Sequence, residues 1–128
     1  MRAISLLLDV LVVLLFAVVG RASHSEGLSV LGVLGVAWPF GAGMLGGWLV
    51  AAGLAQVPMS RVRAGVLVWL ATVAGGMSIR ALTGQGSAPA FVVVAALTLG
   101  LGVLGWRLVL RWVRQLGSDD RPTSRPSA

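Results

Sequence analysis

Two charged residues lie inside long apolar segments of this 128-residue chain, Asp9 in the first and Arg107 in the last. Burying an aspartate at the middle of a membrane helix costs about 3 kcal/mol, and less toward its ends. Helical rise places both residues a short way in from the same end of their helices, which predicts an intramembrane charge pair. Two roles stay open: Asp9 as a proton- or cation-coupling carboxylate, or a buried pair that fixes the register of the helices.

A second group of polar side chains follows the first and third apolar segments. We expect it to form a cluster on the outer face of the membrane, made of Arg21, Ser23, His24, Arg80, Thr83 and Gln85. Two guanidinium groups with neighbouring hydroxyl and amide donors could bind an anionic group. Alternatively, both arginines reach lipid phosphates and cap the carbonyl ends of their helices.

Several function classes are excluded by what the sequence lacks. It has no cysteine and one histidine, so we expect no metal site and no cofactor. There is no nucleophile motif, no phosphate-binding loop and no catalytic pair of carboxylates, and we therefore expect no enzyme activity. The net charge of +6 comes from arginines at the ends of apolar runs, which indicates lipid contacts and topology signals rather than nucleic-acid binding.

The composition indicates the elements that must hold these residues. The chain is 57% hydrophobic and 11% charged, and a soluble fold of this length could not hide so much apolar surface. We predict an all-α membrane protein, a bundle of four transmembrane helices, within a domain of residues 1–116. The spans should cover about 4–20, 28–55, 64–80 and 89–112. Residues 117–128 should form a disordered cytoplasmic tail.

The second span should be kinked and tightly packed. Pro39 lies in its middle beside Trp38, and proline removes a helical hydrogen bond. Gly43 and Gly47 continue a stripe of small residues at four-residue spacing, which allows close approach of a neighbouring helix. The other four tryptophans fit a belt toward the cytoplasmic membrane interface: Trp48, Trp69, Trp106 and Trp112.

The arginines also predict the orientation. Seven of them lie on one side of the predicted membrane, and only Arg21 and Arg80 lie on the other. Loops rich in arginine stay in the cytoplasm, so we expect a multi-pass protein of the cell membrane with both termini cytoplasmic.

The two halves of the chain resemble each other when it is shifted by 59 residues. Arg21-Ala22 then falls on Arg80-Ala81, whereas Asp9 falls on Val68 and Trp48 falls on Arg107. This favours a duplication that gives two parallel helical hairpins, with convergent glycine-rich packing as the alternative.

Taken together, these residues resemble a family of small four-span membrane proteins common in actinobacteria, domain of unknown function 3054. The resemblance covers about residues 8–107, and Ser87 stands where the family pattern has threonine. It implies a membrane location and no established activity. The motifs that carry it are Asp9, Gly20-Arg21 with His24, Trp38-Pro39-Phe40, Arg80-x-x-Thr83-Gly84-x-Gly86, Phe91 and Gly105-Trp106-Arg107.

Two functions lead for this sequence, and a third, a lipid-binding or sensing module, rests on the outer arginines Arg21 and Arg80 alone. The first is a small transporter or channel-like protein, in which Asp9 and Arg107 act from inside and Arg21 and Arg80 face outside. The alternative is a non-catalytic accessory or assembly subunit of a larger membrane complex. The expected partners are the lipid bilayer and either a second copy of the chain or a larger complex.

Overall fold

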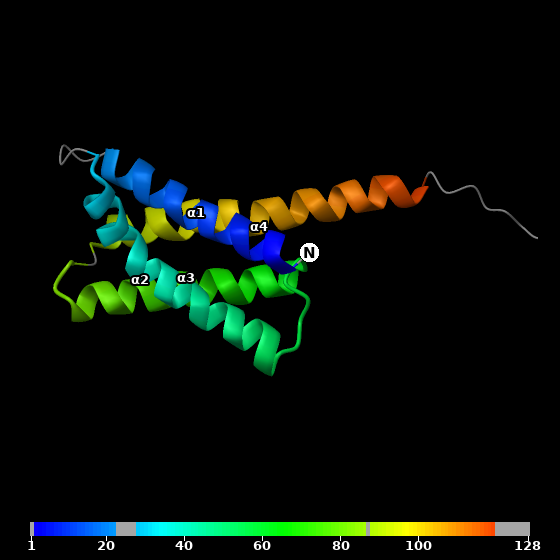
Figure 1. Cartoon of the computed structure of the whole chain (residues 1–128), viewed down its shortest axis with the longest axis horizontal. Coiled ribbons are helices and arrows are strands. Elements are labelled where there is room, and N and C mark those ends of the chain that lie inside the picture. Colours follow the sequence, from blue (N-terminus) through cyan, green and yellow to red (C-terminus); the bar gives the residue numbers. More distant parts are fainter. Residues whose placement is uncertain (1, 23–27, 87, 120–128) are drawn as a thin grey trace, which may run out of the picture.

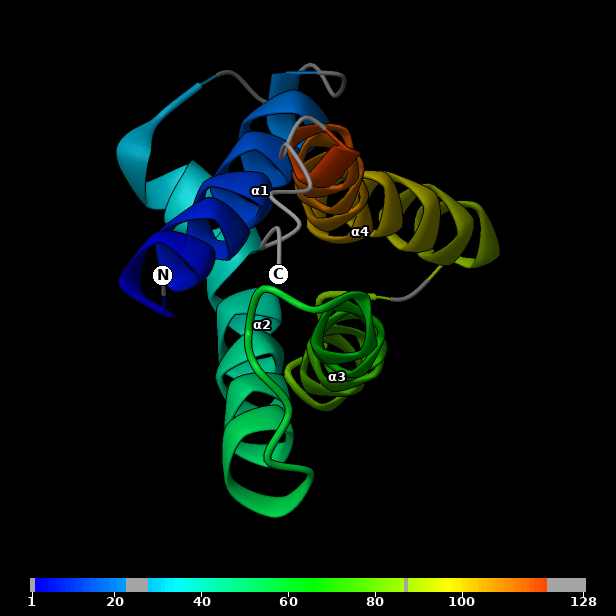
Figure 2. The same cartoon turned by 90° about the vertical axis from the view of Figure 1, so that its right-hand side faces the viewer.

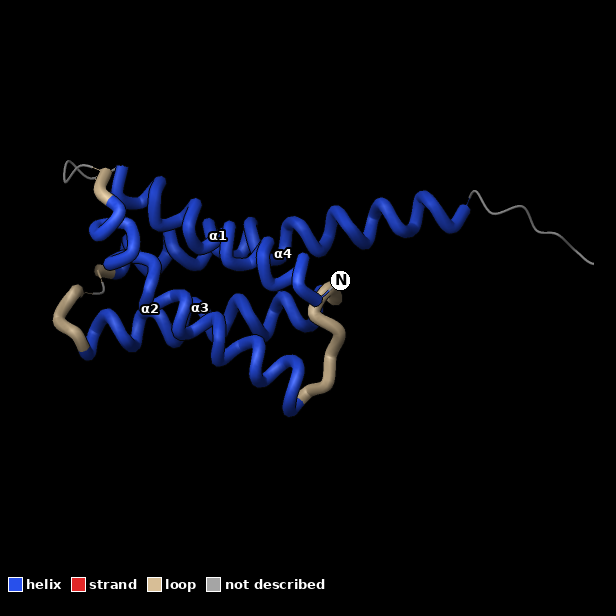
Figure 3. Tube along the Cα trace, in the orientation of Figure 1, coloured by secondary structure: helices blue, strands red, loops and turns tan. Residues whose placement is uncertain are grey.

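The computed structural model describes residues 2–22, 28–86 and 88–119, and within these ranges the chain is helical with no strand. The helices are α1 (Arg2–Ala22), α2 (Val30–Leu49), α3 (Val62–Leu82) and α4 (Pro89–Asp119) (Figure 3). A short π-helix, η1 (Val50–Leu54), continues α2. Together they form 4 segments that are long and apolar enough to cross a membrane, which confirms the prediction of an all-α, four-span bundle.

Local sequence explains several of the helix ends. The Ser29 side chain accepts a hydrogen bond from the Gly32 backbone N–H at 3.0 Å and so caps the start of α2. Pro89 opens α4, where its missing N–H leaves no hydrogen bond unmade. Between α3 and α4, Gly84 and Gly86 adopt positive φ angles of 75° and 84°, which glycine tolerates best.

The four helices run up and down side by side, and each packs against the next along the chain, with α4 also against α1 (Figures 1 and 2). The helices α2 and α3 approach most closely, at glycines. A Cβ added to Gly43 would lie 2.7 Å from the Ala71 carbonyl oxygen, and one added to Gly75 would lie 2.8 Å from the Gly43 Cα. The two backbones are therefore in direct contact, as small residues permit in membrane helices.

The second span is irregular, as its proline and glycines predicted. Pro39 lies inside α2 and is buried, and α2 bends in its first half (Figure 1). Beyond Leu49 the helix changes to the π-helix η1, a feature that the sequence analysis did not place. The helical part of this span ends at Leu54, and two residues further on Gln56 adopts a left-handed conformation with φ of 50°.

The helix α4 is longer than the span predicted for it. It continues past Trp112 to Asp119, and its 31 residues measure about 46 Å, against about 30 Å for the hydrocarbon core of a bilayer. Figure 1 shows its last turns projecting beyond the other three helices. The predicted tail is thus helical as far as Asp119, and residues 120–128 lie outside the described part.

The two ends of the bundle differ in charge. We call the end that holds the starts of α1 and α3, the 55–61 connection and the projecting part of α4 the basic end. Its exposed arginines are Arg2, Arg61, Arg63, Arg111 and Arg114. The other end, here the opposite end, has Arg21 and Arg80 among the described residues. The described charges therefore keep the asymmetry on which the predicted orientation rests.

Aromatic rings fill the core toward the opposite end. Phe16 and Phe40 are buried and meet edge to face at 5.1 Å between ring centroids, and Phe91 lies within 6.2 Å of both. Large aliphatic side chains cover the outside of the bundle instead, among them Leu15, Leu45 and Leu101. An apolar exterior of this kind suits a lipid environment.

The internal duplication stays a prediction. The helices α2 and α4 begin at Val30 and Pro89, which are equivalent positions in the 59-residue shift, but α4 is much longer than α2.

Candidate functional site

The Asp9 carboxylate and the Arg107 guanidinium meet inside the bundle. Arg107 donates from Nη1 to Asp9 Oδ1 at 2.7 Å and from Nη2 to Oδ2 at 2.8 Å. Both side chains are 0% exposed. This is the bidentate geometry in which a planar guanidinium matches a carboxylate best, and it joins α1 to α4.

Two tryptophans complete the surroundings of the carboxylate. Trp106 Nε1 donates to Oδ1 at 2.9 Å, and Trp48 Nε1 donates to Oδ2 at 3.1 Å. Each oxygen of Asp9 therefore accepts two hydrogen bonds, which uses the roughly four acceptor positions of an ionised carboxylate. Because Trp48 belongs to α2, three helices meet at this one side chain.

The remaining donors of Arg107 hold the backbone nearby. Nε donates to the carbonyl oxygen of Met59 at 2.9 Å, and Nη1 also donates to the carbonyl oxygen of Val103 at 2.8 Å. Met59 lies in the connection between α2 and α3, so this connection is fixed to α4. At Gly65, a Cβ would lie 2.6 Å from Arg107 Cδ, so the first turns of α3 pack directly on the arginine side chain.

Taken as chemistry, this site is a neutral ion pair with no exposed surface, and every nitrogen and oxygen atom of its two charged groups has at least one hydrogen-bond partner. No buried side-chain nitrogen or oxygen among the described residues lacks a hydrogen-bond partner. A coupling carboxylate must exchange a proton or cation with water, and Asp9 has no exposed surface through which to do so. Of the two roles that the sequence left open, the geometry favours a pair that fixes helix register.

Sequence reasoning missed four hydrogen-bond partners at this site, two indoles and the carbonyl oxygens of Met59 and Val103. It assigned Trp48 and Trp106 to an interfacial belt, although both donate to Asp9. Two signals could have found them: Trp106 is the neighbour of Arg107, and Trp48 is its equivalent in the 59-residue shift. The carbonyl of Met59 gives no such signal, because backbone acceptors cannot be told apart in a sequence.

The predicted outer-face cluster is only partly gathered by the described residues. Arg80 donates to the Gln85 side chain at 3.3 Å, to the Gly86 carbonyl oxygen at 3.2 Å, and stacks on the Phe91 ring at 4.3 Å. Thr83 donates back to the Ile79 carbonyl oxygen. Among the described residues, the Arg80 side chain donates to the α3–α4 connection and stacks on Phe91 of α4. Its hydrogen bonds are therefore not with the carbonyl end of α3, which the capping alternative expects.

Of the other members of that cluster, the structure describes only Arg21. A Cβ added to Gly32 would overlap the Arg21 guanidinium, so Arg21 lies against the start of α2. Ser23 and His24 lie outside the described residues.

The four residues predicted for the kink and packing of the second span take different places. Pro39 is buried at the bend, and Trp38 beside it is 49% exposed on the outer surface of the bundle. Gly43 and Gly47 both face α3, where a Cβ on Gly47 would lie 2.9 Å from the Val68 Cα. Close α2–α3 packing therefore rests on these two glycines.

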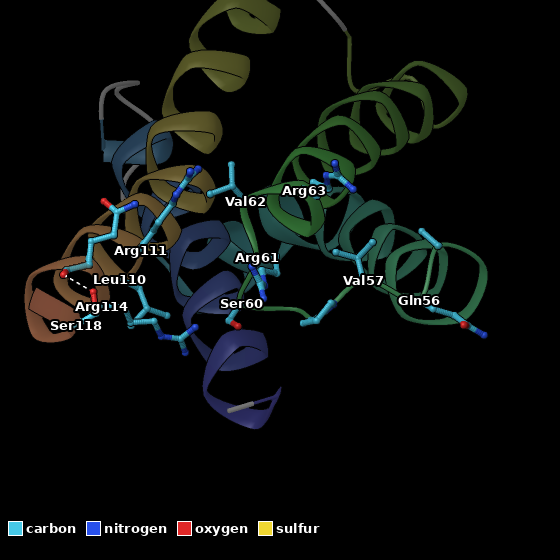
Figure 4. Close-up of a pocket in the computed structure, with 13 residues that line it drawn as sticks. Gln56, Val57, Ser60, Arg61, Val62, Arg63, Leu110, Arg111, Arg114 and Ser118 are labelled. Carbon is cyan, nitrogen blue, oxygen red and sulfur yellow. Dashed lines mark hydrogen bonds between the residues drawn. The ribbon is translucent and has the colours of Figure 1, made fainter. Parts of the chain in front are cut away.

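Two open pockets lie at the ends of the bundle. The pocket at the opposite end measures about 580 Å³ and is mostly apolar, with Phe16, Phe91 and Arg80 in its lining. The pocket at the basic end measures about 870 Å³ and is lined by the 55–63 segment and by α4 (Figure 4). Within the described ranges no three histidine, cysteine or acidic residues gather where they could hold a metal ion.

Comparison with known protein families places the chain in one of them. A family model described as "Protein of unknown function (DUF3054)" matches residues 6–110, which include the whole Asp9–Arg107 site. No curated protein and no solved structure matches the chain.

Proposed function

The chain belongs to the DUF3054 family of proteins of unknown function, and on that premise we propose that it is a non-catalytic accessory or assembly subunit of a larger membrane complex. Its place is the cell membrane, with the basic end in the cytoplasm. In this proposal the Asp9–Arg107 pair serves structure, because it clamps three helices and a connection into one rigid body that a partner can dock on.

One observation supports this choice over transport. The carboxylate of Asp9 accepts two hydrogen bonds on each oxygen and has no contact with solvent. A carboxylate that carries a proton or cation through a cycle needs an acceptor position that opens to water. Opening one here means breaking at least one charge-assisted or indole hydrogen bond in a buried site, at about 1–3 kcal/mol each.

The residues outside the pair agree with a docking role. Trp38, Leu45 and Leu49 are exposed along α2, on the side of that helix away from α3. Lipid covers such a surface in an isolated subunit, and the helices of a partner cover it in a complex. We expect the partner to be another membrane protein that spans the same bilayer.

The decisive experiment separates the charges of the pair from the shape that they maintain. The double variant Asp9→Asn/Arg107→Gln removes both charges; asparagine keeps the size of Asp9, whereas glutamine is shorter than Arg107. In a mild detergent, the wild type should copurify from native membranes with one partner at a fixed stoichiometry, and the double variant should retain that partner. The matched control is Asp119→Asn, which removes an exposed carboxylate at the end of α4.

Two results would count against the proposal. One is a wild-type protein that purifies alone or as a homodimer from native membranes. The other is a solute or proton flux in proteoliposomes that the folded double variant abolishes, since this would assign the charges of Asp9 and Arg107 to transport.

A further inference from the structure

A pocket at the basic end of the bundle is lined by arginines, and no carboxylate of the described residues pairs with them. Four arginines line it, Arg61 and Arg63 from the start of α3 and Arg111 and Arg114 from α4. Figure 4 shows the two pairs coming from the two elements that border the hollow. At about 870 Å³ the pocket has room for a phosphate-bearing head group.

These four arginines differ from the other arginines whose contacts are described above. Arg107 is fully paired with Asp9, and Arg80 is held by Gln85, Gly86 and Phe91. In residues 2–22, 28–86 and 88–119, by contrast, no hydrogen bond or ion pair involves the side chain of Arg61, Arg63, Arg111 or Arg114. The described part of the chain has two carboxylates, of which Asp9 is buried in its own pair and Asp119 lies outside the lining.

The backbone adds to this positive field. The first intrahelical hydrogen bond of α3 runs from Gly65 N–H to the Arg61 carbonyl, so the N–H groups of Val62 and Arg63 precede it. No side chain caps this helix start. The positive end of the helix dipole therefore lies in the same pocket as the guanidinium groups.

A hydrogen bond also fixes the two walls of the pocket to each other. The Arg107 Nε–H donates to the Met59 carbonyl oxygen, which fixes the connection that forms one wall to the helix that forms the other. The projecting part of α4 turns Trp112, Val113 and Leu116 outward, each more than half exposed. An aromatic and aliphatic surface beside arginines is typical of the membrane–water interface, so the pocket opens at the level of lipid head groups.

From these observations we propose that the basic-end pocket binds a phosphate group, from either an anionic phospholipid or a soluble phosphate compound. Guanidinium groups bind phosphate oxygens by paired hydrogen bonds, and the Ser60 hydroxyl in the lining supplies a further donor. The site uses none of the four atoms that bind Asp9. Phosphate binding in this pocket is therefore independent of whether the copurification experiment supports the accessory role.

The test uses the full chain purified in a maltoside detergent, which carries no phosphate. One arm adds dioleoyl phosphatidylglycerol or dioleoyl phosphatidylcholine and counts bound lipids by native mass spectrometry. The other arm titrates inorganic pyrophosphate by calorimetry. The pocket variant is Arg61→Gln/Arg114→Gln, and the matched control is Arg2→Gln, an exposed arginine at the same end but outside the pocket.

We expect the pocket variant to weaken binding at least about tenfold in one of the two arms, and Arg2→Gln to change it less than about twofold. A preference for phosphatidylglycerol that disappears in the pocket variant identifies a lipid head group as the source. Loss of pyrophosphate binding identifies a soluble phosphate compound. Either result supports the proposal.

The proposal is overturned if the wild type binds neither probe, or if the pocket variant and Arg2→Gln weaken binding equally. Equal weakening would mean diffuse attraction to the whole basic end. Circular dichroism and a monodisperse elution profile must show that the variant is folded. If it is not, Arg63→Gln/Arg111→Gln replaces it, with the same expected loss, because these two side chains line the same pocket and are exposed.

Discussion

Asp9 and Arg107 share two hydrogen bonds of 2.7 and 2.8 Å at a point that solvent does not reach, although they stand near opposite ends of the chain. Each partner is then bound by further groups, two indoles on the carboxylate and two carbonyls on the guanidinium. The pair therefore holds α1, α2, α4 and the α2–α3 connection together. Its energetic value lies in this completeness, because a buried charge left without its partner is strongly destabilising.

Removing either charge alone should destabilise the protein severely. We expect Asp9→Asn and Arg107→Gln each to lower the free energy of unfolding by about 3–5 kcal/mol, because each leaves the other charge buried and unpaired. Thermal unfolding in detergent, followed by circular dichroism, measures this as a lower midpoint. Asp119→Asn, at an exposed position, should leave the midpoint unchanged.

The double variant Asp9→Asn/Arg107→Gln should be more stable than the sum of the two single changes predicts. Neither charge remains buried in it, so the cost of an unpaired buried charge, which both single variants carry, is absent. If the two destabilisations simply add in the double-mutant cycle, the two side chains do not act as a pair.

The two indoles should each contribute less than the guanidinium does. Trp48→Phe and Trp106→Phe remove one donor from the carboxylate, and we expect each to lower the free energy of unfolding by about 1–3 kcal/mol. Trp112→Phe is the control, because Trp112 is 62% exposed and its indole N–H makes no hydrogen bond with the described residues. The same thermal unfolding measurement applies, and an equal effect of all three changes would contradict the assigned hydrogen bonds.

The sequence predicts the four spans and the ion pair, but not the two tryptophan donors to Asp9. The spans follow from hydropathy, and the partner of Asp9 follows from depth, since helical rise puts Arg107 at a similar level in its helix. The two tryptophan donors did not follow, because an indole near a helix end fits an interfacial belt equally well. Helix rotation decides between these roles, and it is set by packing between helices that hydropathy does not describe.

The basic-end pocket could not be predicted from the sequence either. The sequence shows arginines at the ends of apolar runs, and topology alone accounts for them. Their convergence depends on the projecting length of α4 and on the connection held by the Met59 carbonyl. The first lies beyond the span that hydropathy predicts, and the second is a backbone contact. Neither leaves a pattern in the residue types.

Close packing of α2 on α3 should be sensitive to a single methyl group. Gly43→Ala places a Cβ 2.7 Å from the Ala71 carbonyl oxygen, which forces the two backbones apart, and we expect a loss of about 1–3 kcal/mol. Gly46→Ala is the matched control in the same helix, because no atom lies within 4 Å of its Cβ position. That change should be neutral or stabilise by up to about 1 kcal/mol through helix propensity. Equal midpoints for the two variants would contradict the close contact.

The orientation can be tested directly, because the chain has no cysteine and a single one can be introduced at will. Ser118→Cys places a thiol at the basic end, and Thr83→Cys places one at the opposite end, both at exposed positions. With the basic end in the cytoplasm, a membrane-impermeant maleimide added to intact cells should label Thr83→Cys and leave Ser118→Cys unmodified until the membrane is opened. The reverse pattern would place the arginine-lined pocket outside the cell, and labelling of both in intact cells would indicate insertion in two orientations.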